Sequence, residues 1–184
     1  MNKTAIRSQL LKQRISLSPA HISSLSKDIV KHICQSDLYQ QAQHIALYLP
    51  FNGEVDITAL LKVKHKHHYL PSIQGKLMQF QHYTPALSLK KHRYGISQPT
   101  FIESLKPVHL DLCLMPLVGF DMGGNRLGMG GGFYDRYFEH AVDDSNPIQL
   151  AGIAYQFQRQ QKLPVQSWDV RINHLFTEQG YFKL

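Results

Sequence analysis

Glycines gather in one stretch of the chain that also carries two arginines and an aspartate. The sequence has 12 glycines, and six of them lie within residues 123–132. Because glycine leaves backbone N–H groups open to close approach, such a stretch can wrap an anion, usually a phosphate. Arg126 and Arg136 have guanidinium forks that suit phosphate oxygens, and Asp135 has a carboxylate of the kind that Mg²⁺ binds beside nucleotides. These residue types indicate phosphate chemistry.

The segments that flank this stretch have the order of a phosphate-binding loop. The apolar run 112–118 is typical of a buried strand, and residues 134–142 favour a helix. The glycine spacing matches neither a Walker loop nor a dinucleotide-binding fingerprint. A flexible hairpin connection explains the glycines equally well, so composition alone leaves phosphate binding and a hairpin open.

Other charged side chains stand where they could reach a ligand. Lys3 and Arg7 lie four residues apart in segment 2–16, whose apolar positions have helical spacing, so they share one helix face. A solvated basic helix has the same pattern. Glu54 follows the apolar strand 44–50, where α/β folds bind ligands, although a turn acid would also fit there.

Three clustered histidines suggest a metal site at first sight. His65, His67 and His68 have a spacing that suits no single helix face, and no cysteine or carboxylate adjoins them. We therefore expect an exposed loop before a strand that begins at Tyr69, and no metal.

Composition limits the class of protein. A chain of 184 residues fits a single domain over residues 1–184, and 43% hydrophobic with 18% charged residues is typical of a globular fold. No apolar run is long enough to span a membrane, and the first residues do not resemble a signal peptide, so we expect a cytoplasmic protein. Cys34 and Cys113 lie far apart in apolar surroundings and are expected to be buried thiols.

The net charge of +7 raises the question of nucleic-acid binding. The basic residues are scattered, and no aromatic–basic motif of an RNA-binding domain is present, so we expect no nucleic-acid partner. The same charge attracts anionic small molecules. We expect a monomer that acts on small molecules.

The predicted helices and strands alternate, which favours an α/β fold with a central, mostly parallel sheet. Ser18 and Pro19 mark the start of a second helix that runs to about residue 35. Asp56 is expected to cap a helix over residues 57–63. Further strands are expected at residues 76–83, 148–155, 172–177 and 180–184.

The string from Arg126 to Arg136 resembles the R-L-G-x-G-x-G-[FY]-Y-D-R motif of the 5-formyltetrahydrofolate cyclo-ligases, also called 5,10-methenyltetrahydrofolate synthetases. Several ordered matches at sensible spacing are more specific than one motif, and here they cover nearly the whole chain. These matches are residues 3–7, 48–56, 95–99, 116–121 and 168–169. The resemblance implies a three-layer sandwich with helices on both faces of the sheet.

The resemblance also implies a reaction. Members of the family close 5-formyltetrahydrofolate to 5,10-methenyltetrahydrofolate through phosphorylation of the formyl oxygen, with ATP as co-substrate, Mg²⁺ as cofactor, and ADP and phosphate as products. The alternative is a protein that keeps the scaffold and only binds folate or nucleotide. The intact set of charged motif residues argues against this alternative.

The motif positions carry the expected roles. The ATP-binding residues would be Lys3, Arg7, Arg126, Leu127, Gly128, Met129, Gly130, Gly131, Gly132, Phe133 and Tyr134. The three basic ones, Lys3, Arg7 and Arg126, would be catalytic because they neutralise phosphate charge. The folate would be contacted by Leu49, Glu54, Tyr94, Met129, Gly130, Gly131, Gly132 and Phe133.

Three positions complete this picture. Mg²⁺ would lie near Asp135 with support from Asp169, although a surface-turn aspartate would explain Asp169 as well. Tyr94 would stack on the folate or anchor its own loop. Some relatives carry a basic residue inside the loop, where this chain has Met129 and Gly131. Either backbone N–H groups and Arg126 suffice for phosphate, or Arg136 contributes.

Overall fold

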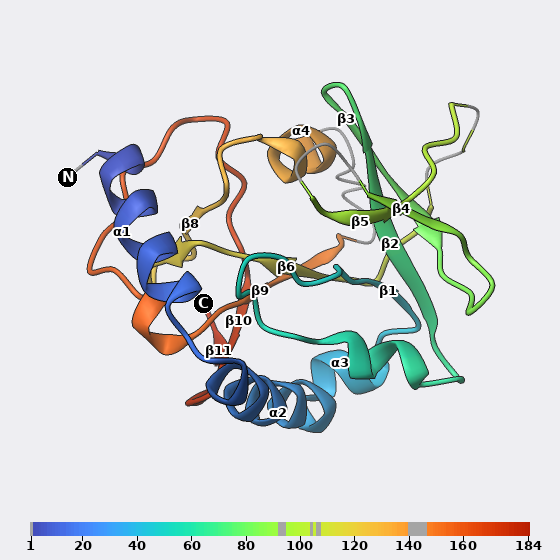
Figure 1. Cartoon of the computed structure of the whole chain (residues 1–184), viewed down its shortest axis with the longest axis horizontal. Coiled ribbons are helices and arrows are strands. Elements are labelled where there is room, and N and C mark those ends of the chain that lie inside the picture. Colours follow the sequence, from blue (N-terminus) through green and yellow to red (C-terminus); the bar gives the residue numbers. More distant parts are fainter. Residues whose placement is uncertain (1, 92–94, 104, 106–107, 140–146) are drawn as a thin grey trace.

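The chain folds around a seven-stranded sheet with strand order β11-β10-β9-β6-β1-β2-β3 (Figure 1). The computed structural model describes residues 2–91, 95–103, 105, 108–139 and 147–184. The five inner strands are parallel, whereas β3 and β11 pair antiparallel at the two edges. The strands are β1 (His44–Ala46), β2 (His67–Gln74), β3 (Leu77–His82), β6 (Leu112–Pro116), β9 (Gln149–Ile153), β10 (His174–Thr177) and β11 (Gly180–Lys183).

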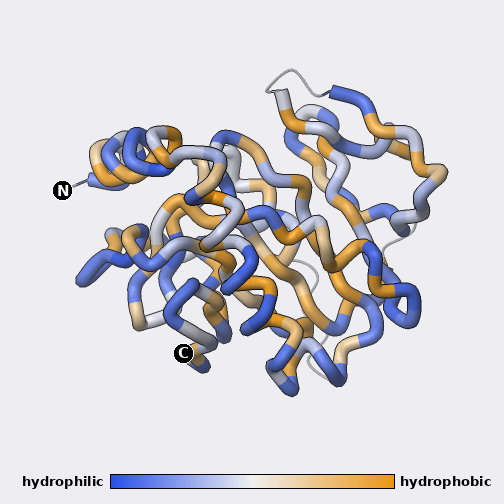
Figure 2. The backbone as a smooth tube through the Cα atoms, turned by 60° about the horizontal axis from the view of Figure 1, so that its bottom comes forward, coloured by the Kyte–Doolittle hydropathy of each residue, from blue (hydrophilic) through white to orange (hydrophobic). Residues whose placement is uncertain are grey.

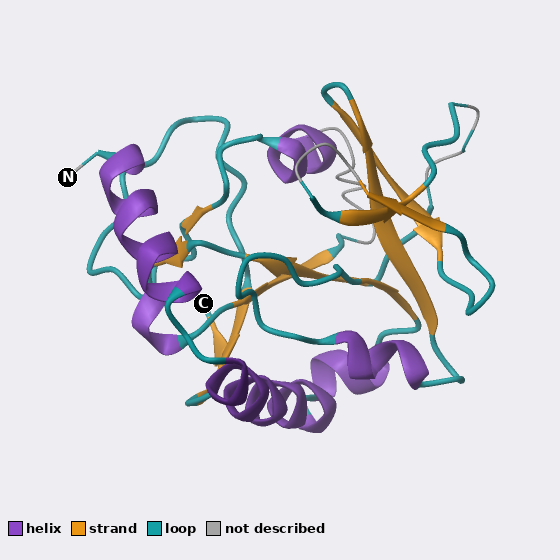
Figure 3. Cartoon of the chain, in the orientation of Figure 1, coloured by secondary structure: helices purple, strands orange, loops and turns teal. Residues whose placement is uncertain are grey.

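Helices cover both faces of this sheet, as Figure 3 shows. The α-helices are α1 (Lys3–Ile15), α2 (Pro19–Gln35), α3 (Asp37–Gln41) and α4 (Phe133–Glu139), and the 3₁₀ helices are η1 (Thr58–Lys62) and η2 (Gln156–Gln158). The sequence signal for α2 is confirmed, because Ser18 Oγ accepts a hydrogen bond from the N–H of His21 and Pro19 is the first helical residue. Two small hairpins pair β4 (Leu89–Lys91) with β5 (Ser97–Pro99), and β7 (Gly119–Phe120) with β8 (Arg126–Leu127).

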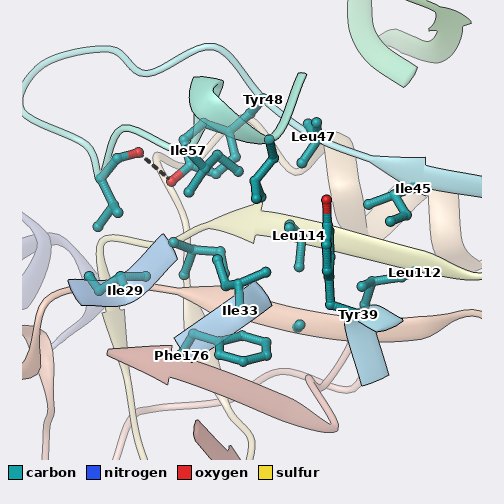
Figure 4. Close-up of a cluster of buried hydrophobic side chains, with 14 of the residues drawn as sticks. Ile29, Ile33, Tyr39, Ile45, Leu47, Tyr48, Ile57, Leu112, Leu114 and Phe176 are labelled. Atoms are coloured by element: carbon teal, nitrogen blue, oxygen red, sulfur yellow. Dashed lines mark hydrogen bonds between the residues drawn. The ribbon is translucent and has the colours of Figure 1, made fainter. Parts of the chain in front are cut away.

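Alternate residues of the central strands point to opposite faces, which explains the three layers. Leu112 and Leu114 of β6 pack in the cluster that contains Ile29 and Ile33 of α2 (Figure 4). The intervening β6 residues belong to a second cluster with Phe138 of α4. Figure 2 shows the hydrophobic segments concentrated in the centre of the molecule. The predicted fold class, a three-layer α/β sandwich with a mostly parallel sheet, is confirmed.

α1 occupies a different place from α2. It packs its buried Ile6 and Leu10 against Val118 and Leu127, which border the β7–β8 hairpin. Its remaining faces carry Lys3, Arg7 and Lys12, whereas Arg14 shares the buried face. α1 therefore lies at one end of the sheet, where its charged side chains can reach the loops that follow the strands.

Three local predictions were wrong. Strand β2 begins at His67 instead of Tyr69, because His67 pairs in register with His44 of β1, and His68 is buried. The helix expected over residues 57–63 is the shorter 3₁₀ helix η1, whose N-cap residue is Ile57 instead of Asp56. The Asp56 carboxylate nevertheless accepts from the backbone N–H of Thr58, the first residue of η1, and from its Oγ1 hydroxyl.

The third wrong prediction concerns the glycine stretch, which is two structures instead of one. Gly123 and Gly124 belong to the β7–β8 turn, where Asp121 Oδ1 accepts from the N–H of Gly123 at 3.0 Å. The other four glycines, Gly128, Gly130, Gly131 and Gly132, belong to the loop before α4. A hairpin therefore separates β6 from the loop, so the hairpin interpretation is confirmed for Gly123 and Gly124, and phosphate binding stays a prediction for residues 128–132.

The prediction of free thiols holds for both cysteines, whereas the prediction of burial holds for Cys113 alone. Cys34 and Cys113 are both free thiols, of which Cys113 is buried and Cys34 is partly exposed. Burial raises the pKa of the Cys113 thiol, so it stays protonated. None of the helices in the described ranges is long and apolar enough to cross a membrane.

Candidate active site

The order of the strands creates a crevice between β1 and β6. These strands are neighbours, but the chain leaves β1 toward β2 on one side and later reaches β6 on the other. Where successive connections diverge in this way, the carboxyl ends of parallel strands border a ligand-binding crevice. A cavity of about 1090 Å³ opens at this point, bordered by Leu49 after β1 and Leu117 after β6. Such a volume has room for two reactants.

The loop before α4 offers unpaired backbone donors to this cavity. None of the N–H groups of residues 128–132 donates to a group in the described part of the chain. Gly130 and Gly132 have the left-handed φ values of 96° and 62°, which other residues adopt at a cost. A Cβ on Gly132 would lie 2.8 Å from Arg136 Nη1. The sequence therefore needs glycine at these points to hold the N–H groups open.

Arg126 lies at the base of the same loop. Its Nη2 donates to Asp135 Oδ1 at 2.7 Å, and its side chain is 6% exposed. Its Nε is buried and has no hydrogen-bond partner among the described residues. A buried guanidinium N–H without a partner is costly, so Arg126 presents a donor that an anionic ligand would satisfy.

α1 adds two cations to the cavity wall. Lys3 Nζ pairs with the carboxylate of Asp169, and Arg7 Nε donates to the carbonyl oxygen of Gly128 at 2.8 Å. Arg7 also stands beside Gly130, where an added Cβ would lie 3.5 Å from its guanidinium carbon. The two side chains thus share one helix face that borders the glycine loop, and α1 is not a merely solvated basic helix.

The two carboxylates expected near Mg²⁺ each keep one oxygen unbonded in the described structure. Asp135 Oδ1 accepts from Arg126 and from the N–H of Val170, and Asp169 Oδ2 accepts from Lys3 and from the N–H of Gln166. Mg²⁺ commonly takes one or two carboxylate oxygens together with phosphates and water. The donor set therefore fits that ion once a phosphate is present. Within the described ranges no cluster of three metal-ligating side chains exists, the histidines included.

Glu54 lies in the turn after β1 and lines the same cavity. Its Oε2 accepts from the N–H of Phe51 at 3.1 Å, and the side chain is 11% exposed. Burial raises the pKa of Glu54 to about 7, while Arg14 and the Phe51 N–H act in the opposite direction. A carboxylate in this setting can accept hydrogen bonds from the N–H groups of a flat heterocycle.

Residues 1–178 match the model of the 5-formyltetrahydrofolate cyclo-ligase family. The chain belongs to this family. A 5-formyltetrahydrofolate cyclo-ligase of Haemophilus influenzae is 35% identical over 173 residues, which cover 90% of this chain and 91% of that protein. One of Escherichia coli K12 is 32% identical over 174 residues, which cover 90% and 94%.

Solved structures agree with this family assignment. A 5,10-methenyltetrahydrofolate synthetase of Aquifex aeolicus has a TM-score of 0.85 and 32% identity, and the match covers 100% of this chain and 93% of that one. A 5,10-methenyltetrahydrofolate synthetase of Mycoplasma pneumoniae has a TM-score of 0.75 and 27% identity, with 97% and 99% coverage.

The cyclo-ligase fold gathers nearly all the expected site residues in one cavity. Those that line it are Lys3, Arg7, Leu49, Glu54, Arg126, Leu127, Gly128, Met129, Gly130, Gly131, Gly132, Phe133, Tyr134, Asp135 and Asp169. Tyr94 lies outside the described residues. The arrangement brings these positions together, and their individual roles stay predictions.

Sequence reasoning left the role of Arg136 open, noted Trp168 only as part of a family match, and missed Arg14 as a residue of the site. Arg136 lines it, and its Nη2 donates to the carbonyl of Gly131 at 2.7 Å, so this arginine braces the loop. Trp168 lines it too and is 60% exposed. Arg14 lies behind Glu54 with its guanidinium buried. The spacing of Arg14 four residues after the buried Leu10 was the available signal of its burial. Trp168 was visible in the sequence as part of the matching pair 168–169.

Proposed function

We propose that this chain closes 5-formyltetrahydrofolate to 5,10-methenyltetrahydrofolate, converts ATP to ADP and phosphate, and requires Mg²⁺. The observation that carries the proposal is a group of unpaired hydrogen-bond donors, suited to a phosphate, that border one cavity. The free N–H groups of residues 128–132 and the unpartnered Nε of Arg126 border the same cavity as Glu54. The names of the similar proteins support the substrate.

The chemistry explains why these donors are needed. A formamide oxygen is a poor leaving group, and phosphorylation turns it into a good one. The γ-phosphoryl group moves from ATP to the formyl oxygen, and ADP leaves. The neighbouring folate nitrogen then attacks the formyl carbon and loses its proton to solvent, the carbon–oxygen bond breaks, and phosphate departs with closure of the ring. The protein must position the two reactants and neutralise the negative charge that spreads over the phosphoryl oxygens.

The chain's own residues divide these tasks. The loop N–H groups and Arg126 would hold the phosphoryl group, with Lys3 and Arg7 supplying further positive charge from α1. Asp135 and Asp169 would hold Mg²⁺, which would neutralise negative charge on the phosphate oxygens. Glu54 would fix the folate by accepting hydrogen bonds from its pterin ring. Apart from positioning, no proton transfer by a side chain is required for the phosphoryl step.

The test is the near-ultraviolet absorbance of the methenyl product, followed with protein, Mg²⁺, ATP and 5-formyltetrahydrofolate. We expect growth of the band only when ATP is present, and its loss in Arg126→Ala. The matched control is Arg171→Ala, which removes an exposed arginine outside the cavity and should keep the band. Folded protein that binds the folate but gives no band would refute the ligase and favour a binding protein.

A further inference from the structure

Arg14 is a buried arginine that the proposed reaction does not yet use. It lies in α1 and is 1% exposed. Its Nε donates to the carbonyl oxygen of Asn52 at 3.0 Å, and its Nη1 donates to that of Leu117 at 3.1 Å. These two bonds fix the guanidinium between the turn after β1 and the end of β6, which are the two borders of the active-site crevice.

The third nitrogen of Arg14 faces Glu54. Its Nη2 lies 3.6 Å from Glu54 Oε1, which is close enough for charge attraction and longer than a hydrogen bond. Glu54 Oε2 accepts from Phe51, whereas Oε1 accepts no hydrogen bond from any described residue. Arg14 thus supplies charge to the carboxylate and leaves Oε1 available to a donor in the cavity.

The backbone around this pair shows that the contact is built in. Asn52 and Gly53 both have left-handed φ values, 49° and 74°. A Cβ on Gly53 would lie 2.8 Å from the carbonyl oxygen of Arg14. The turn that carries Glu54 is therefore pressed against α1 at the residue that provides the guanidinium.

Other titratable groups do not replace the charge of Arg14. Tyr48 and Tyr134 also interact electrostatically with Glu54, and burial raises the pKa of both hydroxyls, so they stay neutral. Burial lowers the pKa of Arg14 while Glu54 opposes that shift, and arginine remains charged even so. Within the described structure, Arg14 is the cation whose charge acts on Glu54.

We propose that Arg14 is a positioning residue for the folate: it keeps the Glu54 carboxylate charged and aimed into the cavity, so that Glu54 can accept hydrogen bonds from pterin N–H groups. This inference rests on the proposed function, because it assigns Glu54 to the folate. A neutral Glu54 carries a proton on one oxygen and would meet a pterin N–H donor with one acceptor fewer.

The test compares Arg14→Gln, Glu54→Gln and the double variant by their KM for 5-formyltetrahydrofolate, KM for ATP and kcat. Arg14→Gln should raise the folate KM about 10-fold or more, the usual size of a lost charged hydrogen bond, and leave the ATP KM nearly unchanged. On the Glu54→Gln background the same change should have little further effect, because the two residues act as one unit.

The pH profile separates this role from a purely structural one. In the wild type, 1/KM for the folate should rise with pH through about 7, as Glu54 ionises. In Arg14→Gln that rise should move to higher pH, since the charged carboxylate has lost its cation. Arg14→Lys keeps the charge and should keep the wild-type midpoint. If Arg14→Gln does not fold, Arg14→Lys still tests the inference.

Several results would overturn the inference. One is that Arg14→Gln raises the folate KM by the same factor in the wild type and on the Glu54→Gln background. Another is that the pH midpoint of 1/KM for the folate does not move in Arg14→Gln. A shifted midpoint in folded Arg14→Lys would also do so. Failure of the proposed function looks different, because the wild type itself would then show no ATP-dependent methenyl band.

Discussion

Arg126 Nη2 donates to Asp135 Oδ1 at 2.7 Å, and this bond ties the end of β8 to the first turn of α4. The glycine loop, residues 128–132, lies between the two tied points. Asp135 is itself held by the N–H of Val170 at 3.1 Å. The loop is therefore fixed at both ends while its own N–H groups stay free, which is the arrangement that a preformed anion site requires.

Asp135→Asn should weaken the binding of Mg²⁺. The amide keeps an oxygen that accepts from Arg126 but loses the negative charge that attracts the ion. We expect the Mg²⁺ concentration for half-maximal activity to rise about 10-fold or more, as the loss of one charged metal ligand or its support commonly costs. Titration of activity with Mg²⁺ in metal-free buffer measures this. Asp28→Asn, on an exposed face of α2, is the control, and equal titrations for all three proteins would contradict the metal assignment.

Gly130→Ala should impair ATP use more than Gly128→Ala. The φ of 96° at Gly130 is strained for alanine, by about 1–2 kcal/mol, whereas Gly128 is not left-handed and an added Cβ there meets nothing within 4 Å. We expect a higher KM for ATP and a lower free energy of unfolding in Gly130→Ala. Steady-state kinetics and urea unfolding provide the two measurements. Equal damage from both changes would mean that the methyl group blocks ligand space and that strain is not the cause.

Trp168 should report ligand binding by its fluorescence. It is the chain's single tryptophan, it lines the cavity and it is 60% exposed. A ligand that fills the cavity next to Asp169 and Lys3 removes water from the indole, so its emission should change as Mg²⁺ and ATP are added. Trp168→Phe supplies the blank. Activity that saturates with ATP while the emission stays constant would place the nucleotide away from this side chain.

Acid should destabilise the fold through His68. Burial lowers the pKa of His68 to about 4, with help from Lys66 and neighbouring histidines, and its Nε2 has no partner among the described residues. Because the unfolded chain has the ordinary pKa of about 6.5, it binds the proton first as pH falls, and stability is lost between about pH 6.5 and 4.

The loss from this one group should reach about 2 kcal/mol at pH 5. Urea unfolding at pH 7 and pH 5 measures it in the wild type and in His68→Leu, which should lose less stability over the same interval. His21→Leu, on an exposed face of α2, is the matched control. If His68→Leu loses as much as the wild type, another group is responsible for the acid sensitivity.

Much of the site was predictable because its parts lie in short ordered strings. Lys3 and Arg7 share a helix face, and Arg126 and Asp135 flank glycines, so spacing alone identifies them as candidates. Their meeting in one cavity with Glu54 depends on strand order, which the motif matches implied and local patterns did not. The fold class was predictable from the alternation of helices and strands and from the motif matches.

What escaped prediction depends on long-range contacts. Arg14 stands four residues after Leu10 on the buried face of α1, but its charge is typical of a surface residue. Its burial depends on the distant partners Asn52, Leu117 and Glu54. The early start of β2 follows from the pairing of His67 with His44. The β7–β8 turn was hidden because Gly123 and Gly124 stand so near the loop glycines that one composition signal covers both structures.

The ion pair of Lys3 with Asp169 joins residues that are 166 positions apart. The ribosome makes α1 first, but the partner of Lys3 emerges only after β1, β6 and β9 have been translated. A nascent chain that ends before residue 169 holds the glycine loop without this carboxylate. The proposed nucleotide site is therefore complete only late in translation, once residue 169 has been made.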